Sequence, residues 1–141
     1  MIVIDTDVLA VYYVYKWDKR YSVARKIIEE DIGYTKATTI VNVLELTGIM
    51  SLAQNGSKAR RLFYILHGHF NILYWKHWPT QPVWVSVMLK HIQRRLSLGD
   101  ALIAWILDEY AGEIEYFVTW NTKHFKGRVP VEVVEPNHIL E

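Results

Sequence analysis

The chain opens with Met1-Ile2-Val3-Ile4-Asp5-Thr6-Asp7-Val8-Leu9, in which four apolar residues run directly into acidic ones. An uninterrupted apolar run bounded by polar groups is typical of a strand covered on both faces, as in parallel sheets. We therefore predict a short buried strand over residues 1–4. Ligands bind beyond the carboxyl ends of the strands of an open parallel sheet, so Asp5 is expected to point into a binding crevice.

Helices and further strands are predicted to alternate along the rest of the chain. Asn55-Gly56 is predicted to end a helix, and Pro79 and Pro82 mark a loop or a helix start. One predicted helix is capped by Thr38 or Thr39 and runs to about Gln54, and another is capped by Ser57 and runs through His67. The other predicted helices cover residues 22–31, 83–95 and 98–110. The further predicted strands cover residues 70–75, 116–120 and 131–134. This alternation predicts an α/β fold with a mainly parallel sheet, formed as a single domain over residues 1–141.

The composition favours a globular protein and excludes several kinds of site. The 141 residues are 51% hydrophobic and include no cysteine, which rules out a disulfide framework, a cysteine-ligated zinc site and thiol catalysis. The start of the chain has no basic leader or cleavage site, and no apolar stretch reaches the ~20 residues of a spanning helix. We therefore expect a cytoplasmic protein without a membrane segment.

The net charge of +1 conceals an uneven distribution of charged residues. From Leu46 through Gly99 there is no Asp or Glu, whereas seven basic residues and several aromatic ones occur there. Basic groups with interspersed rings bind phosphate backbones and stack unpaired bases. The candidate RNA-binding residues are Arg60, Arg61, Arg94 and Arg95. A solvated helix face with aromatic residues in the core explains the same pattern equally well.

Three more polar residues occupy positions that suggest the same crevice as Asp5. Asn121 follows the strand predicted over 116–120, Asp100 follows Gly99 at a helix start, and Glu45 interrupts an otherwise apolar helix. Each also has an ordinary structural explanation, because Asp100 suits a helix cap, Asn121 a turn and Glu45 a solvated helix position.

Four blocks of sequence, taken together, carry more information than any one of these residues. They are Ile2-Val3-Ile4-Asp5-Thr6-Asp7-Val8-Leu9, Val43-Leu44-Glu45-Leu46, Leu98-Gly99-Asp100-Ala101-Leu102-Ile103-Ala104 and Phe117-Val118-Thr119-Trp120-Asn121-Thr122-Lys123-His124-Phe125. In this order and spacing the chain resembles the PIN-domain ribonucleases, and among them the VapC-type toxins of toxin–antitoxin pairs. The resemblance implies a three-layer α/β/α sandwich and a metal-dependent endoribonuclease.

The resemblance also assigns roles to residues. It implies that Asp5, Glu45 and Asp100 are catalytic and hold Mg²⁺ or Mn²⁺, and that Asn121 stands where many members carry a fourth acid. Hard divalent cations take oxygen ligands and activate a water for in-line attack on a phosphodiester, so a carboxylate cluster suits this chemistry.

Thr119 and Asp7 form a secondary set of candidates. Thr119 matches a hydroxyl common at the end of that strand in the family, whereas Asp7 stands where Asn or Ser is frequent. Because side chains alternate along a strand, Asp5 and Asp7 would share a face if the first strand continued that far. Asp7 would then restore the negative charge absent at Asn121.

Partners and alternatives follow from the same residues. The resemblance implies an RNA substrate, a homodimer and a small antitoxin protein; Tyr12, Tyr13, Tyr15 and Trp17 suit such an interface, although core packing explains them equally well. A PIN-like scaffold that binds RNA or protein without catalysis stays open because of Asn121. A haloacid-dehalogenase-like phosphatase also stays open, with Asp5 as nucleophile and Asp7 as acid/base, although Thr119 then follows Asp100 instead of preceding it.

Overall fold

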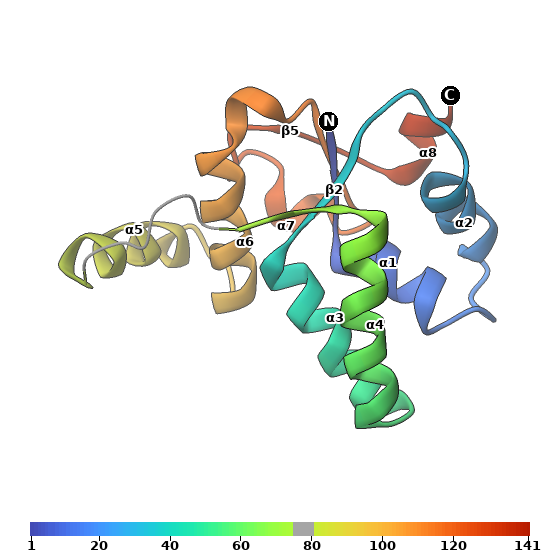
Figure 1. The fold of residues 1–141 in the computed structure, drawn as a ribbon. Helices are drawn as coiled ribbons and strands as arrows, with labels where there is room; N and C mark the ends of the chain where they lie inside the picture. Colours follow the sequence, from blue (N-terminus) through green and yellow to red (C-terminus); the bar gives the residue numbers. More distant parts are fainter. Residues whose placement is uncertain (75–80) are drawn as a thin grey trace.

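The structure is a computed structural model that describes residues 1–74 and 81–141, with side chains left out for 81–84 (Figure 1). Its described part contains a five-stranded sheet in the order β3-β2-β1-β4-β5, and every neighbouring pair is parallel. The strands are β1 (Ile2–Ile4), β2 (Lys36–Thr39), β3 (Asn71–Leu73), β4 (Tyr116–Val118) and β5 (Glu132–Val134). All five strands therefore end at the same edge of the sheet.

Helices cover both faces of this sheet. They are α1 (Thr6–Tyr13), α2 (Tyr21–Glu29), α3 (Ile40–Ala53), α4 (Gly56–His69), α5 (Gln81–Gln93), α6 (Leu98–Glu109), α7 (Thr122–Phe125) and α8 (Pro136–Leu140), with a 3₁₀ turn at Ala111–Glu113. Figure 1 shows α3 and α4 side by side and extending beyond the sheet, with α5 and α6 on the opposite side from α2 and α8. This is the three-layer α/β/α arrangement that the sequence predicts.

Alternation along β1 explains the two layers of core. Ile2 and Ile4 pack with residues of α1, α2, α3 and α4, whereas Val3 packs with residues of α6 and α7. All three side chains are fully buried. Each such burial stabilises the fold by about 1.5–3 kcal/mol, so the central strand anchors both faces.

The first strand ends one residue before Asp5, which begins a helix that no sequence pattern predicts. Asp5 is the N-cap of α1, and its carboxylate accepts a hydrogen bond from the Thr6 N–H. Because the chain turns helical there, the first strand does not continue to Asp7, and the condition under which Asp5 and Asp7 would share a strand face is not met. Asp7 instead lies in the first turn of α1.

Other differences concern short elements and caps. β2, α7 and α8 are absent from the predicted elements, because they are too short or too polar to show a period. Asn55, rather than Ser57, caps α4, and Ser97, rather than Asp100, caps α6. The remaining predicted helices and strands are present with ends shifted by a few residues, including a helix start at Gln81 just before Pro82. Trp75 and Pro79 lie outside the described residues.

A search of the described helices for one long and apolar enough to cross a membrane finds none.

Candidate active site

The candidate site lies where β1 and β4 end, beside the first turns of α1, α3 and α6. Asp5 follows β1 directly, and Thr119 follows β4 directly. Both residues are buried, with 5% of Asp5 and none of Thr119 exposed. A carboxylate in such a position needs several hydrogen-bond donors, because burying an unpaired charge is costly.

Asp5 receives those donors from three different segments. Oδ1 accepts from the Thr6 N–H at 2.8 Å and from Asn42 Nδ2 at 2.8 Å, and Oδ2 accepts from the Thr119 hydroxyl at 2.7 Å. The donors come from α1, α3 and the end of β4. The position of the Asp5 side chain is therefore held by tertiary contacts.

Asn42 is a site residue that the sequence patterns do not reveal. It is fully buried, and its Oδ1 accepts from the Thr39 hydroxyl at 2.7 Å and from the Thr39 N–H at 3.3 Å. Its Nδ2 reaches Thr6 Oγ1 at 2.9 Å as well as Asp5. The spacing of a capping box, Thr39-x-x-Asn42, was the available signal, and it points to a helix start and not to Asp5.

Asp7 holds the loop that follows β4. Its Oδ2 accepts from the backbone N–H groups of Trp120 (2.8 Å) and Asn121 (3.2 Å) and lies 3.1 Å from Thr119 Oγ1. Asp5 and Asp7 thus flank one hydroxyl that has a single proton to donate. The structure thus brings Asp7 and Thr119, the secondary candidates, next to Asp5. They meet because Asp7 lies in the first turn of α1, and not because the first strand continues.

The acids also influence one another electrostatically. Burial, and then the charge of Asp7, raises the pKa of Asp5 to about 8, and Glu45 adds to this shift while the bonds from Thr119 and Thr6 oppose it. Burial also raises the pKa of Asp7, against the hydrogen bonds that its carboxylate accepts. These carboxylates are held close enough together that their charges destabilise one another.

Glu45 and Asp100 approach one another from α3 and α6. A Cβ built at Gly99 would stand 3.9 Å from the Glu45 carboxyl carbon, so the first turn of α6 lies directly beside this side chain. Burial and then the charge of Asp100 raise the pKa of Glu45 to about 7, although part of Glu45 remains in solvent. Since the charge of Glu45 in turn raises the pKa of Asp5, Glu45 links Asp5 and Asp100 electrostatically.

His124 is a second residue that the sequence patterns do not assign to the site. Its Nδ1 lies 3.2 Å from Asp100 Oδ2, and both side chains are partly exposed. An ion pair formed there with protonated His124 contributes little to stability, because water screens it. The contact does limit where the Asp100 carboxylate can point.

Asn121 reaches the site through its backbone. Its N–H donates to Asp7 Oδ2 and lies 3.0 Å from Thr119 Oγ1, while its side chain makes no cap to α7. Within residues 1–74 and 81–141, no three His, Cys, Asp or Glu side chains are placed to hold one metal ion. The donor chemistry still fits a hard cation, because Asp5, Glu45 and Asp100 offer only carboxylate oxygens.

The predicted RNA-binding arginines lie on two separate surfaces. Arg60 and Arg61 are exposed on α4, and Arg60 lines a groove of about 420 Å³ between α3 and α4 together with Leu44 and Tyr64. Arg94 and Arg95 are exposed just after α5, on a different part of the molecule (Figure 1).

The aromatic residues after the first strand divide into two kinds. Tyr12, Tyr13 and Tyr15 are half-buried and pack against the core, and Tyr12 also stacks on Tyr21. Trp17, by contrast, is 83% exposed. Core packing therefore accounts for the tyrosines but not for Trp17.

Comparisons with known proteins find likeness in structure alone. No protein-family model and no curated protein sequence matches the chain. Among solved structures, a chain of VapBC2 from Rickettsia felis, bound to a DNA fragment from its promoter, matches with a TM-score of 0.63 at 19% identity, over 96% of this chain and 98% of that one.

Two further solved structures agree. A chain of VapBC-1 from nontypeable Haemophilus influenzae gives a TM-score of 0.64 at 19% identity, covering 97% of this chain and 99% of the other. A chain of FitAcB from Neisseria gonorrhoeae gives 0.62 at 18%, covering 98% and 99%. At this identity the likeness establishes the fold, a PIN-like α/β/α sandwich matched over 96–98% of the chain, and the prediction of fold class is confirmed.

Proposed function

We propose that the chain is a metal-dependent endoribonuclease that acts as the toxin of a toxin–antitoxin pair. The observation that supports this most is that Asp5, Glu45 and Asp100 lie close enough to one another for the charge of Glu45 to raise the pKa of Asp5 and for the charge of Asp100 to raise the pKa of Glu45. Such crowding costs free energy in a metal-free protein, and a bound divalent cation would remove that cost.

Asp5, Glu45 and Asp100 are the residues proposed to hold Mg²⁺ or Mn²⁺. When bound, such an ion lowers the pKa of a coordinated water and stabilises charge on phosphate oxygens. Asp5 would contribute a ligand already oriented by its three hydrogen bonds. Glu45 and Asp100 project from the sides of α3 and α6 and would turn toward Asp5 to complete the set.

The proposal extends to partners. The neighbouring structures carry the names VapBC2, VapBC-1 and FitAcB, and the VapBC2 structure is bound to a DNA fragment. By analogy we propose a small antitoxin partner and a homodimer for this chain, with RNA as substrate in the cytoplasm. Asn121 is proposed as a further catalytic-site residue, placed beside Asp7 by its backbone.

Cleavage of RNA by the purified chain tests the proposal. RNA is incubated with Mg²⁺ or Mn²⁺, with and without EDTA, using wild type, Asp5→Asn, Asp100→Asn and the control Asp31→Asn, an exposed acid in the loop before β2. Wild type and Asp31→Asn should cleave, whereas Asp5→Asn and Asp100→Asn should lose about 100-fold or more, since even outer partners of a metal site contribute 10–100-fold. Cleavage that persists in EDTA or in Asp5→Asn contradicts the proposal, and hydrolysis of p-nitrophenyl phosphate without RNA cleavage would favour a phosphatase.

A scaffold without catalytic activity is the second candidate, and two observations favour it. No three acids in the described part of the chain are already placed around one ion, and position 121 carries an amide in place of an acid. Calorimetric titration with Mn²⁺ separates the two functions. A nuclease should bind Mn²⁺ in a manner that depends on Asp5 and Asp100, and a scaffold should not.

A further inference from the structure

A tight turn connects α1 to α2 and carries an exposed tryptophan. The N–H of Asp18 bonds the carbonyl of Tyr15, and the N–H of Tyr21 bonds the carbonyl of Asp18. Trp17 lies within this turn, 83% exposed, with its ring edge-on to Tyr15 at 5.8 Å. The ring is therefore held at one place on the surface without being buried.

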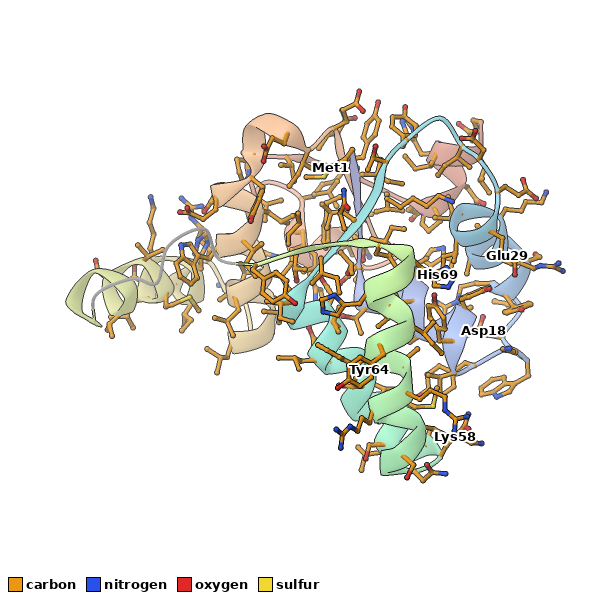
Figure 2. The ribbon with its side chains drawn as sticks, in the orientation of Figure 1. Met1, Asp18, Glu29, Lys58, Tyr64 and His69 are labelled. Carbon is orange, nitrogen blue, oxygen red and sulfur yellow. The ribbon has the colours of Figure 1, made fainter. Side chains whose placement is uncertain are left out.

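Arg20 in the same turn is fixed by Asp18. The Asp18 carboxylate accepts from the Arg20 backbone N–H (2.8 Å), from Nε (3.0 Å) and from Nη2 (2.8 Å), and these bonds lower the pKa of Asp18 to about 2. Figure 2 shows Asp18 on the side of the molecule away from α5. A guanidinium held by two parallel bonds has a fixed plane, which suits stacking.

The plane of Arg20 lies over Trp120. The guanidinium carbon is 4.6 Å from the centre of the Trp120 ring. Trp120 follows Thr119, and its N–H donates to Asp7 Oδ2 at 2.8 Å, while Thr119 donates to Asp5. The charge of Asp7 also contributes to the raised pKa of Arg20, after the larger effect of Asp18. The stack therefore adjoins the acids of the candidate active site.

We infer that the stack of Arg20 on Trp120, together with the exposed ring of Trp17 from the same α1–α2 connection as Arg20, forms a base-binding shelf that receives an unpaired nucleobase of the substrate. The inference rests on the proposed function for its choice of RNA as ligand, and it specifies unpaired strands over duplex. Every base has a π-face, and aromatic rings with an adjacent Arg bind such faces with little sequence preference. A base on the shelf would bring its phosphate toward Asp5 and Asp7.

The surroundings of the shelf favour a nucleobase over a protein partner. The tyrosines of this region are half-buried and pack within the chain, so Trp17 is the large hydrophobic side chain that this connection exposes. What remains is one exposed ring and one planar cation stacked on a second ring. This combination is small and flat, as a single base is.

Binding of labelled oligonucleotides tests the shelf without relying on cleavage. Affinity is measured by fluorescence anisotropy at low salt in EDTA, with a single-stranded RNA of about eight nucleotides, its abasic counterpart, and the matching duplex. The variants are Trp17→Ala, Trp17→Phe and Arg20→Gln, and the control is Tyr34→Ala, which removes a ring near the opposite edge of the sheet. Urea unfolding of each variant verifies that the fold is intact.

The shelf predicts a loss that depends on bases. Trp17→Ala should weaken binding of the natural single strand at least about 5-fold, the equivalent of ~1 kcal/mol of stacking per base, and leave the abasic strand unchanged. Trp17→Phe should retain most of the affinity, and Tyr34→Ala all of it. If Arg20→Gln fails to fold, the two Trp17 variants still decide the question.

Two results would overturn the shelf. One is a Trp17→Ala protein that binds the natural strand as wild type does or loses both strands equally. The other is an effect of Trp17→Ala on sedimentation alone, which would assign the ring to a protein interface. Base-dependent binding without any RNA cleavage would support the base-binding shelf and contradict the proposed nuclease function. The failure of one proposal can therefore be distinguished from the failure of the other.

Discussion

Replacement of Asn42 by alanine should destabilise the protein far more than an ordinary loss of a helix cap. Asn42 is fully buried and lies at the centre of a network that joins Asp5, Thr6 and Thr39. Removing its amide takes one of three donors from the Asp5 carboxylate and leaves the Thr39 N–H without its side-chain acceptor. Both groups then remain buried and incompletely paired.

The size of the effect follows from these two losses. A hydrogen bond to a charged group contributes about 1.5–3 kcal/mol, and a buried donor left unpaired costs about 1–3 kcal/mol. Together they predict a loss of about 2.5–6 kcal/mol from the free energy of unfolding. Since domains of this kind are stable by only about 5–15 kcal/mol, the variant should lose at least about a sixth of its stability.

Asn55 provides the matched control. It also accepts a hydrogen bond at the start of a helix, from the Lys58 N–H at 2.9 Å, but it is exposed and contacts no buried acid. Asn55→Ala should therefore cost about 1 kcal/mol, the usual value for a lost cap. The difference between the two variants isolates the contribution of the buried network.

Urea unfolding followed by far-UV circular dichroism measures both variants at about pH 9, where Asp5, with its pKa of about 8, carries its charge. Equal m-values with separated midpoints would show that stability alone has changed. An isosteric variant, Asn42→Asp, adds a test of charge, because it places an acceptor where Asp5 needs a donor and should be less stable than Asn42→Ala above neutral pH. If Asn42→Ala costs no more than Asn55→Ala, the network does not hold Asp5 in the way described.

Three further predictions concern the same residues. In metal-free protein the pKa values of Asp5 (about 8) and Glu45 (about 7) lie above their unfolded values near 4, so the folded state holds these protons more tightly and the free energy of unfolding should fall as pH rises from about 4 to 8. An Asp5→Asn variant whose stability depends on pH as strongly as that of wild type would contradict this pH dependence. Addition of Mn²⁺ at pH 8 should raise the Tm measured by circular dichroism. At about pH 9, where Asp5 is charged, Thr119→Val removes the hydroxyl that donates to Asp5 and should cost about 1.5–3 kcal/mol in urea unfolding, against about 1 kcal/mol for Thr38→Val, whose hydroxyl donates to the neutral Ile4 carbonyl at 2.9 Å. Equal costs would show that the charge on Asp5 contributes nothing. Arg60→Ala/Arg61→Ala should weaken RNA binding and flatten its salt dependence by about 0.7 in slope for each phosphate that is no longer neutralised, because both guanidinium groups are exposed on α4. Arg94→Ala/Arg95→Ala is the comparison from the other surface, and unchanged affinity at low salt in the α4 variant would discard that surface.

Much of the fold is predictable because its central strands are buried on both faces. The apolar runs at Ile2–Ile4 and Tyr116–Val118 are legible in the sequence since strands between two helical layers have no polar face. The strand at Lys36–Thr39 is not, because its buried residues are Ala and Thr, and the two threonine hydroxyls are satisfied by Ile4 and Asn42. The hydrogen bond of the Thr38 hydroxyl depends on Ile4, a partner that is distant in the chain.

The candidate site shows the same division. The positions of Asp5 and Asp100 next to predicted elements were visible in the sequence, as was the exceptional place of Glu45 in an apolar helix. Asn42 and His124 were not, because each acquires its role from a partner 37 or 24 residues away. Alternation along a longer first strand would also have placed Asp5 near Asp7. In the structure the strand ends before Asp5, and the first turn of α1 brings the two acids together instead.

The sequence by itself determined most of the buried strands and the longer helices, and hence an α/β fold with acids at strand and helix ends, because hydrophobic periodicity is a local property. The tertiary structure alone decided which donors hold Asp5, that Asp7 secures the loop after β4, and that Arg20 stacks on Trp120 beside these acids. These arrangements depend on distances of a few ångströms between segments far apart in the chain. Hydrogen bonding and charge act over such distances, and the order of residues does not encode them locally.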